Sequence, residues 1–481
     1  MSVNDFEIVI GLEVHVQLST QSKIFCSDSA AFDLNPNTHV SLISLAHPGT
    51  LPKLNLKVLE YGARLGLALG CSMEGVTTFE RKNYFYPDLP KGYQITQYRN
   101  PLCRGGSVKI QKAGSVKEIA IHHIHLEEDA GKLMHFDGKD VSGVDYNRAG
   151  VPLLEIVTTP CMHDPEEAAA FVSEIRKLVR FIGIGDGNME EGSLRADANV
   201  SVRAKGSGVL GTKVEIKNMN STKNLRTAVQ HEAERQIACL QRGEAIVSET
   251  RLFDVDAGKT FSMRQKEEVN DYRYFPEPDL CSFEITNEWL ASIRESMPKT
   301  SDEYELKFVQ QFHLPAYDAV VLASEVATAR LFEELAGSTA HAKSAANWVL
   351  GPVKNYLNEH PDKEFPLSVQ SLVWMIDAVE NGKLNYTAAA KKLFPELLKA
   401  PEKDPEQLCE ALGLFDVQSD DELILMARDI IRIYPLKVEE YHKGKKGILS
   451  MFMGELMKRT AGKVDPKRAT EILSNLLNEK H

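Results

Sequence analysis

Apolar and polar residues alternate in short runs over roughly the first 290 residues, and Gly, Pro and Asn turns separate the runs. An alternation with a period of two is typical of β-strands. Two segments in this part have helical periodicity instead. One helix is expected to begin at Pro165 behind the N-cap Asp164 and to end at Gly183, and a second is expected from near Ser221 to Gly243. The pattern therefore predicts a mainly β part that contains a few helices.

The hydrophobic period lengthens from about residue 295 onward, where amphipathic helices are separated by short breaks with Pro and Gly. The polar segment APEKDPEQ at 400–407 is expected to be a linker. At roughly 150 residues per domain, the 481 residues correspond to about three domains. We expect an α+β protein with an antiparallel β domain at 1–294, an all-α domain at 295–402 and a small helical tail at 408–481.

The composition is that of a protein with real cores, since 43% of the residues are hydrophobic and 26% are charged. Wholesale disorder is thereby excluded. No apolar run approaches the roughly 18 residues of a membrane span, and the N-terminal residues lack the pattern of a signal peptide. The seven cysteines are scattered without a CxxC pair, which is typical of reduced thiols. We expect a cytoplasmic protein with no membrane partner.

Charge is unevenly distributed along the chain. The formal net charge of −12 argues against a basic protein that wraps nucleic acid. Residues 442–468, however, contain eight Lys or Arg and two acidic residues. The C-terminal end is therefore a candidate surface for an anionic partner. Charge alone fits a solvated helical face equally well.

Carboxylates occupy the polar positions of several predicted strands. Any single half-exposed antiparallel strand would show such alternation, so the combination is more informative than each strand. If the strands share one sheet, five carboxylates converge on one surface, and they repel one another unless a cation binds. Hard oxygen ligands favour magnesium or manganese, which would in turn hold nucleotide phosphates. The five are Glu13, Glu127, Glu155, Asp197 and Glu215, with His15 near them in sequence.

The segment RKNYFYPDLPKGYQITQ at 81–97 adds lysines and tyrosines. Lys82 and Lys91 suit phosphates, while Tyr84, Tyr86 and Tyr93 suit a base or a ribose. The chain has no classical Gly-rich ATP-binding loop with Gly and Lys at the required spacing. These residues are therefore candidates for a nucleotide site of another kind.

Long strings resemble the GatB family, the B subunits of the tRNA-dependent amidotransferases, nearly from end to end. Strings of this length and order are highly specific. In the β part they are IGLEVHVQL at 10–18, HPGTLPKLN at 47–55, RKNYFYPDLPKGYQI at 81–95, HLEEDAGK at 125–132, DYNRAGVPLLEIV at 145–157, MEEGSLRADANVSVR at 189–203, VEIKNMNS at 214–221 and DYRYFPEPDL at 271–280. In the helical part they are LPAYDA at 314–319, NWVLG at 347–351 and GKKGILSMFMGELMKRTAGKVDP at 444–466.

The resemblance implies a cradle-like antiparallel β catalytic domain, a helical domain and a YqeY-like helical tail that helps to bind tRNA. It implies an ATP-dependent ligase that acts on tRNA charged with Glu or Asp where Gln or Asn is required. ATP phosphorylates the side-chain carboxylate, and ammonia then displaces the phosphate to form the amide. Magnesium neutralises the phosphates during the transfer.

The family's motifs imply roles for particular residues of this chain. Lys82 and Glu128 are candidates for catalysis, with Glu128 also a possible metal ligand, and Lys82, Tyr84 and Tyr86 are candidates for binding the nucleotide. The implied metal ligands are Glu13, His15, Glu127, Glu155, Asp197 and Glu215. His15 is an unusual magnesium ligand, so a hydrogen-bonding role is equally open. The candidates for tRNA contacts are Lys445, Lys446, Lys458 and Arg459, with surface solubility as the alternative.

One departure from the family concerns zinc. Many members carry two cysteine pairs near residues 26–44, whereas here Cys26 remains and Asp28, Ser41 and Ser44 stand at the other positions. We therefore expect no structural zinc.

The chain shows no glutaminase nucleophile and no amidase Ser-Ser-Lys signature, so the ammonia must come from elsewhere. The resemblance implies a heterotrimer with an amidase A subunit and a small C subunit, and a channel for ammonia. Two other functions stay open: a non-catalytic tRNA-binding scaffold, and a free-standing metal-dependent phosphotransferase or amide ligase for a small acidic metabolite. The sequence does not distinguish tRNA(Gln) from tRNA(Asn) as the substrate.

Overall fold

The computed structural model describes residues 5–478 except 34, 74, 113, 137, 139, 266–271, 361–362, 416–419, 461–463 and 465. The chain forms two compact units, Met1–Thr300 and Ser301–His481. Over the described residues, none of the helices combines the length and the apolar character that a bilayer crossing requires.

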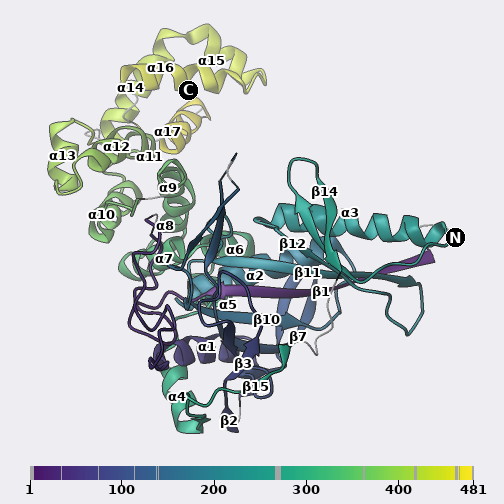
Figure 1. The fold of residues 1–481 in the computed structure, drawn as a ribbon. Coiled ribbons are helices and arrows are strands. Elements are labelled where there is room, and N and C mark those ends of the chain that lie inside the picture. The colour runs from purple at the N-terminus through teal and green to yellow at the C-terminus, as the bar shows by residue number, and fades with distance from the viewer. Residues whose placement is uncertain are drawn as a thin grey trace. The chain divides into compact units, whose positions relative to one another are not determined.

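The first unit is built on a large sheet (Figure 1). Among the described residues this sheet has 12 strands, in the order β14-β13-β12-β11-β1-β10-β7-β4-β3-β15, with β5 and β6 also paired to β7. The neighbours are antiparallel except β12 and β13, which are parallel. The strands are β1 (Phe6–Gln17), β3 (Glu80–Asn83), β4 (Tyr93–Thr96), β5 (Cys103–Arg104), β6 (Ser107–Lys112), β7 (Ser115–Glu128), β10 (Pro152–Thr158), β11 (Leu194–Ala204), β12 (Val214–Lys217), β13 (Glu249–Asp254), β14 (Lys259–Gln265) and β15 (Phe275–Pro276).

Two small antiparallel pairs complete the strands of this unit. They are β2 (Gly75–Thr77) with β16 (Phe283–Ile285), and β8 (Lys132–His135) with β9 (Ser142–Asp145). The mostly antiparallel sheet, followed by a helical second unit, confirms the predicted α+β class.

Helices cover the apolar face of the large sheet. They are α1 (Leu56–Ala68), α2 (Pro165–Phe181) and α3 (Thr222–Gln241), and α4 (Asn287–Glu295) packs on α1. Alternate residues of β1, such as Leu12 and Val14, are fully buried beneath them because a strand turns successive side chains to opposite faces. At Gly62 of α1, an added Cβ would lie 2.4 Å from the Leu102 side chain, so glycine allows the close approach of this helix to the sheet.

The two helices predicted in the first unit are confirmed. In α2, Pro165 occupies the first turn and the carboxylate of Asp164 accepts a hydrogen bond from the Glu166 N–H. In α3, the hydroxyl of Ser221 accepts a hydrogen bond from the Asn224 N–H. Each cap satisfies a backbone donor that the helix leaves unpaired at its start.

Over its described residues, the second unit consists of helices joined by turns and loops, with one isolated bridge between Leu384 and Phe415. Its elements are α5 (Ser301–Gln310), α6 (Ala316–Leu322), α7 (Val326–Ser338), α8 (Ala342–Trp348), a π-helical turn (Val349–Val353), α9 (Lys354–Glu359), α10 (Val369–Glu380), α11 (Tyr386–Ala388), a second π-helical turn (Ala389–Leu393), α12 (Phe394–Lys399), α13 (Pro405–Ala411), α14 (Asp420–Ile433), α15 (Pro435–His442), α16 (Ile448–Arg459) and α17 (Pro466–Asn478). The last four share a core that includes Leu423, Phe452 and Leu473.

The linker expected at 400–407 is partly helical. Helix α13 begins at Pro405, and Asp404 accepts a hydrogen bond from the Gln407 N–H as its N-cap. Two prolines suggest an extended segment, but proline is also favoured in the first turn of a helix, where its missing N–H costs no hydrogen bond. The domain boundaries expected at 294/295 and 402/408 stay predictions.

Candidate active site on the polar face of the sheet

The polar face of the large sheet collects the predicted carboxylates. Strands β12, β11, β1, β10 and β7 are neighbours in this order, so the expectation that they share one sheet is confirmed (Figure 1). The register places Glu13 opposite Asp197, and His15 opposite both Glu155 and Arg195. Residues paired across neighbouring strands point to the same face. The antiparallel register therefore brings side chains from five strands onto one surface.

The first cluster of this face consists of His15, Glu127 and Glu155, whose ligand atoms lie within 4.8 Å of one another. His15 Nε2 is 3.3 Å from Glu155 Oε2 and 3.9 Å from Glu127 Oε1. His125 lies beside the cluster, with Nε2 3.4 Å from Glu155 Oε2. Burial alone would lower the pKa of His15, but the carboxylates of Glu155 and Glu127 raise it to about 9. Without a metal ion, His15 is therefore a cationic partner of the two carboxylates.

The second cluster consists of Glu13, Asp197 and Glu215, whose carboxylate oxygens also lie within 4.8 Å of one another. The ammonium of Lys217 contacts Asp197 and lies 3.2 Å from Glu215 Oε1. The Asn199 amide donates to Glu13 Oε1 at 2.9 Å. The Lys217 ammonium thus offsets part of the negative charge of the three carboxylates, and the Asn199 amide stabilises Glu13 by a hydrogen bond.

The donor set of the second cluster suits a hard divalent cation. Burial, followed by the nearby carboxylates of Glu155 and Glu215, raises the pKa of Glu13, as expected where negative groups crowd together. The Asn199 Oδ1 atom is buried and has no hydrogen-bond partner in the part of the chain that the structure describes. Carboxylate and amide oxygens are the ligands that magnesium prefers. An unsatisfied oxygen beside three carboxylates is what a cation site would use.

Lys82 extends this face toward the edge of the sheet. It pairs with Gln94 across β3 and β4, and Thr96, two residues further along β4, pairs with Glu127 of β7. Burial alone would lower the pKa of Lys82, but Glu127 and other neighbouring groups raise it. The Lys82 ammonium lies 5.0 Å from the ring centroid of Tyr272. The structure therefore brings Lys82 to the carboxylates, as a phosphate-binding residue would require.

The tyrosines predicted to bind a nucleotide are placed differently from each other. The Tyr84 ring lies 5.7 Å from the Lys82 ammonium and 5.8 Å from the Tyr272 ring. Burial raises the pKa of Tyr84 to about 12, so it stays neutral at physiological pH. Tyr86 is 49% exposed, and its carbonyl oxygen accepts a hydrogen bond from the Leu89 N–H at 3.0 Å in the turn after β3. Tyr84 is thus brought to the site, whereas Tyr86 is half in solvent.

Glu128 points away from the polar face. It follows Glu127 on β7 and therefore alternates to the other side of the strand. Its carboxylate binds the Lys91 ammonium at 2.6 Å and accepts a hydrogen bond from the Ile95 N–H at 2.8 Å. The structure does not place Glu128 with the two carboxylate clusters, and its catalytic role stays a prediction.

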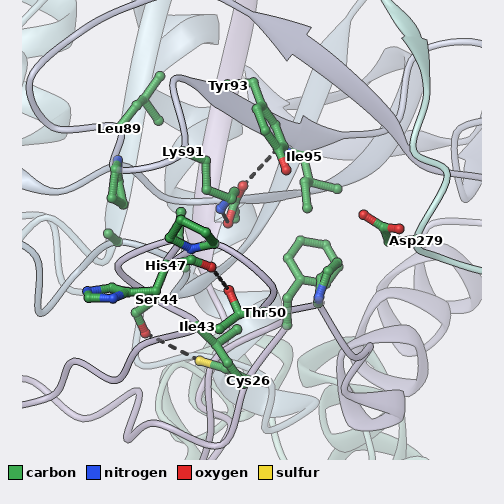
Figure 2. Close-up of a pocket in the computed structure, with 18 of the residues that line it drawn as sticks. Cys26, Ile43, Ser44, His47, Thr50, Leu89, Lys91, Tyr93, Ile95 and Asp279 are labelled. Atoms are coloured by element: carbon green, nitrogen blue, oxygen red, sulfur yellow. Dashed lines mark hydrogen bonds and ion pairs between the residues drawn. The ribbon is translucent and has the colours of Figure 1, made fainter.

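Glu128 and Lys91 instead line a cavity of about 270 Å³. Figure 2 shows Lys91 and Tyr93 on one side of this cavity, with Ser44 and His47 across from them. The lining thus comes from the reverse side of β4 and β7 together with the loop that precedes α1.

The loop at 26–44, for which the sequence predicts no structural zinc, is held together by hydrogen bonds. The Ser44 hydroxyl donates to the Asp28 carboxylate, and the Ser41 N–H donates to the same carboxylate at 2.9 Å. The Cys26 sulfur lies 3.5 Å from the Ser44 hydroxyl. The Asp28 carboxylate, which accepts hydrogen bonds from both serines, thus connects two parts of this loop.

Several residues of the polar face were not selected by sequence reasoning. Lys217 and Arg195 sit at polar positions of their strands, but alternation gave no reason to prefer them. Arg195 Nη2 lies 3.0 Å from Asp129 Oδ2, and Asp129 is only 5% exposed. Tyr272 lies in the string at 271–280, which has no strand periodicity. Acidic clusters attract cationic neighbours, and that electrostatic rule is the signal that could have identified Lys217 and Arg195.

The four predicted tRNA-contacting residues lie in the second unit and are all exposed. Lys445 is 3.2 Å from Glu440 Oε2, and the Lys446 ammonium lies 4.1 Å from the Tyr441 ring centroid. Lys458 and Arg459 occupy the last turn of α16, where the helix dipole favours cations. Their binding role stays a prediction.

The sheet, its two carboxylate clusters and the adjacent lysine form a candidate active site in the first unit, and a helical unit follows it in the chain. A profile for the GatB/GatE catalytic domain matches residues 8–291, and a profile for the GatB domain named Yqey matches residues 330–477. The chain belongs to the GatB family.

Close relatives match over nearly the full length. The B subunit of the aspartyl/glutamyl-tRNA(Asn/Gln) amidotransferase of Thermoanaerobacter pseudethanolicus is 44% identical over 98% of this chain and 100% of its own. The corresponding B subunits from Thermodesulfovibrio yellowstonii and Synechococcus elongatus are each 43% identical over 98% of this chain, and 100% and 98% of their own lengths are covered. The resemblance seen in the sequence strings is confirmed.

Proposed function

We propose that this chain is the ligase subunit of an ATP-dependent amidotransferase that converts Glu-tRNA(Gln), Asp-tRNA(Asn) or both to the amidated forms. In the first step an oxygen of the substrate's side-chain carboxylate attacks the γ-phosphorus of ATP, and ADP leaves. In the second step ammonia attacks the activated carbonyl carbon, and the carbon–oxygen bond to phosphate breaks. A carboxylate alone is a poor acyl donor, whereas the acyl phosphate has a good leaving group.

The residues of the polar face suit the first step. Glu13, Asp197 and Glu215 are the residues that would hold a divalent cation, with the Asn199 Oδ1 as a further oxygen. When bound, such a cation supplies neutralisation of the nucleotide phosphates. Lys82 adds a fixed ammonium at the same face, beside Glu127. The polar face thus provides both the negative groups that hold a cation and a positive group that orients a phosphate.

His15 and Glu155 are better suited to a supporting role in the first cluster. His15 is held as a cation by two carboxylates, so it donates hydrogen bonds rather than a lone pair to a metal. Burial alone would raise the pKa of Glu155, but His125 and protonated His15 lower it. We therefore favour hydrogen bonding over metal ligation for His15.

The full-length relationship to the amidotransferase B subunits is the observation that carries the proposal. Because those relatives are each one subunit of a larger enzyme, the relationship also supports assembly with other subunits. We propose an amidase A subunit and a small C subunit as the partners, ammonia from the amidase, and tRNA contacts through Lys445, Lys446, Lys458 and Arg459.

The test follows ATP cleavage by the complex assembled with its amidase partner. We expect Glu-tRNA or Asp-tRNA to stimulate cleavage, and the tRNA that does so identifies the substrate. Glu127→Gln and Glu215→Gln should abolish the stimulated cleavage while tRNA still binds. Glu7→Gln is the matched control, because Glu7 lies on β1 but pairs with Arg203 outside both clusters.

Two outcomes would favour other functions. Cleavage that is unaffected by both cluster substitutions would support the non-catalytic tRNA-binding scaffold. Amide formation on a free acidic metabolite, without any tRNA, would support a free-standing ligase.

A further inference from the structure

An aromatic cluster lies at the edge of the polar face, next to Lys82. The rings of Tyr98 and Tyr274 are stacked, with centroids 4.3 Å apart and planes 6° from parallel. The Tyr272 ring packs against Tyr274 edge-on at 6.1 Å and against Tyr84 at 5.8 Å. Four tyrosines from three separate segments thus form one continuous wall.

The register places this wall on the same face as the carboxylates. Phe275 of β15 pairs with Arg81 of β3, so Tyr274 comes level with Lys82. Tyr98 follows Thr96 of β4 by two residues, and Thr96 pairs with Glu127. Two residues span at most about 7 Å. The backbone of Tyr98 therefore lies within about 7 Å of Thr96, the residue that pairs with Glu127 of the first carboxylate cluster.

The backbone behind the wall is held in an uncommon conformation. Arg273, between Tyr272 and Tyr274, has a φ of 44°, which is costly for a residue with a side chain. The Asn83 amide donates to the carbonyl oxygen of Arg273 at 2.9 Å. A conformation of this kind persists where the surroundings enforce it, and here it sets two tyrosine rings side by side.

Tyr98 presents an open aromatic surface. Tyr274 covers one face of its ring, yet Tyr98 is 55% exposed. Arg99 follows Tyr98 and Arg273 precedes Tyr274 in the chain, and both are exposed. Arg104, also exposed, donates to the Arg99 carbonyl oxygen at 2.8 Å. In a chain of net charge −12, three exposed arginines on the segments that carry or adjoin an open aromatic ring are residues that suit a single-stranded nucleic acid.

We propose that the Tyr98–Tyr274 pair binds the unpaired 3′ end of the charged tRNA, with the terminal base stacked on the open face of Tyr98. The amino acid is esterified to the ribose of that nucleotide. A base seated on Tyr98 therefore directs the side-chain carboxylate toward Glu127 and Glu155, while the exposed arginines contact backbone phosphates. This inference rests on the proposed function and adds substrate-binding residues to it.

The first test measures stacking directly and needs no turnover. A charged tRNA with 2-aminopurine in place of the terminal adenine is bound to the assembled complex, and stacking quenches its fluorescence. We expect Tyr98→Ala to remove the quenching and Tyr98→Phe to retain it. Tyr317→Ala, at a tyrosine that is 78% exposed in the second unit, is the control and should leave the quenching intact.

The second test separates tRNA from ATP, which also carries an adenine. Loss of one base–aromatic stack should raise the KM for charged tRNA roughly five- to hundredfold in Tyr98→Ala. The KM for ATP should stay unchanged, and Tyr98→Phe should restore the value for tRNA. A rise in the KM for ATP alone would assign the ring to the nucleotide and overturn the inference, as would unchanged values for both substrates.

The stacking inference and the proposed function fail in different ways. If the native complex cleaves ATP with charged tRNA but Tyr98→Ala behaves as native, the stacking inference is wrong and the proposed function stands. If the native complex shows no tRNA-stimulated cleavage, the proposed function itself is wrong.

Discussion

Replacing Lys217 by Met should strengthen the binding of a divalent cation at the second carboxylate cluster. The Lys217 ammonium contacts Asp197 and lies 3.2 Å from Glu215 Oε1, where it competes with any cation for these oxygens. Methionine has a similar length and no charge. Without the ammonium, Asp197 and Glu215 lose their fixed counter-charge, and a cation becomes their main source of neutralisation.

The magnitude follows from Coulomb's law. Two unit charges 4 Å apart interact by about 1 kcal/mol in water and about 4 kcal/mol at an effective dielectric constant of 20, and a divalent ion doubles these values. The Lys217 side chain is 39% exposed and can turn toward solvent, so the interaction energy is near the value for water, about 2 kcal/mol for a divalent ion. A change of about 2 kcal/mol corresponds to roughly thirtyfold tighter binding.

The assay is a titration with Mn²⁺, whose free form is counted by electron paramagnetic resonance. Placing the substitution in a Glu155→Gln background weakens the first cluster and isolates the second. Lys213→Met removes the same charge from an exposed position just before β12 and should leave the affinity within about twofold. Unchanged or weaker Mn²⁺ binding in Lys217→Met would show that the Lys217 ammonium does not compete with a cation for these oxygens. It would also refute the assignment of this cluster as a cation site.

Three further results are expected. Burial alone would raise the pKa of Glu167, but Lys112 and Lys117 hold it at about 2, below its ordinary 4.5. The ionised Glu167 carboxylate therefore stabilises the fold fully above about pH 4.5, and this stabilisation is lost as the pH falls toward 2. Glu167→Gln should lower the free energy of unfolding by about 2–3 kcal/mol at pH 7 and by less below pH 4.5. Urea unfolding of the native protein and the variant across this pH range measures the difference. A difference that does not change with pH would contradict a role for these ion pairs. Gly211→Ala should lower the melting temperature, because its Cβ would lie 2.1 Å from the carbonyl oxygen of Val202, and an unchanged value would contradict that packing. Prolonged chelation should leave the melting temperature unchanged in magnesium-free buffer, whereas zinc found by elemental analysis would contradict the expectation of no structural zinc.

The sequence determined which residues of each strand could share a face. Alternation alone placed Glu13 and His15 on one side of β1 and Asp197 on the polar side of β11, because a strand turns successive side chains in opposite directions. An N-cap residue and a proline in the first turn located the start of α2, and an N-cap serine located the start of α3. Such signals act within a few residues of the helix end. Such features depend on neighbours along the chain and can be predicted without the fold.

Only the tertiary structure decided how those strands meet. The order β12-β11-β1-β10-β7 sorts the carboxylates into two clusters, and no local pattern specifies that order. Alternation along the strand predicted that Glu127 and Glu128 face opposite sides, but only the fold shows that Lys91 is the partner of Glu128. The stacking of Tyr98 on Tyr274 joins segments far apart in the chain, because contacts of that kind are set by strand pairing and not by sequence spacing.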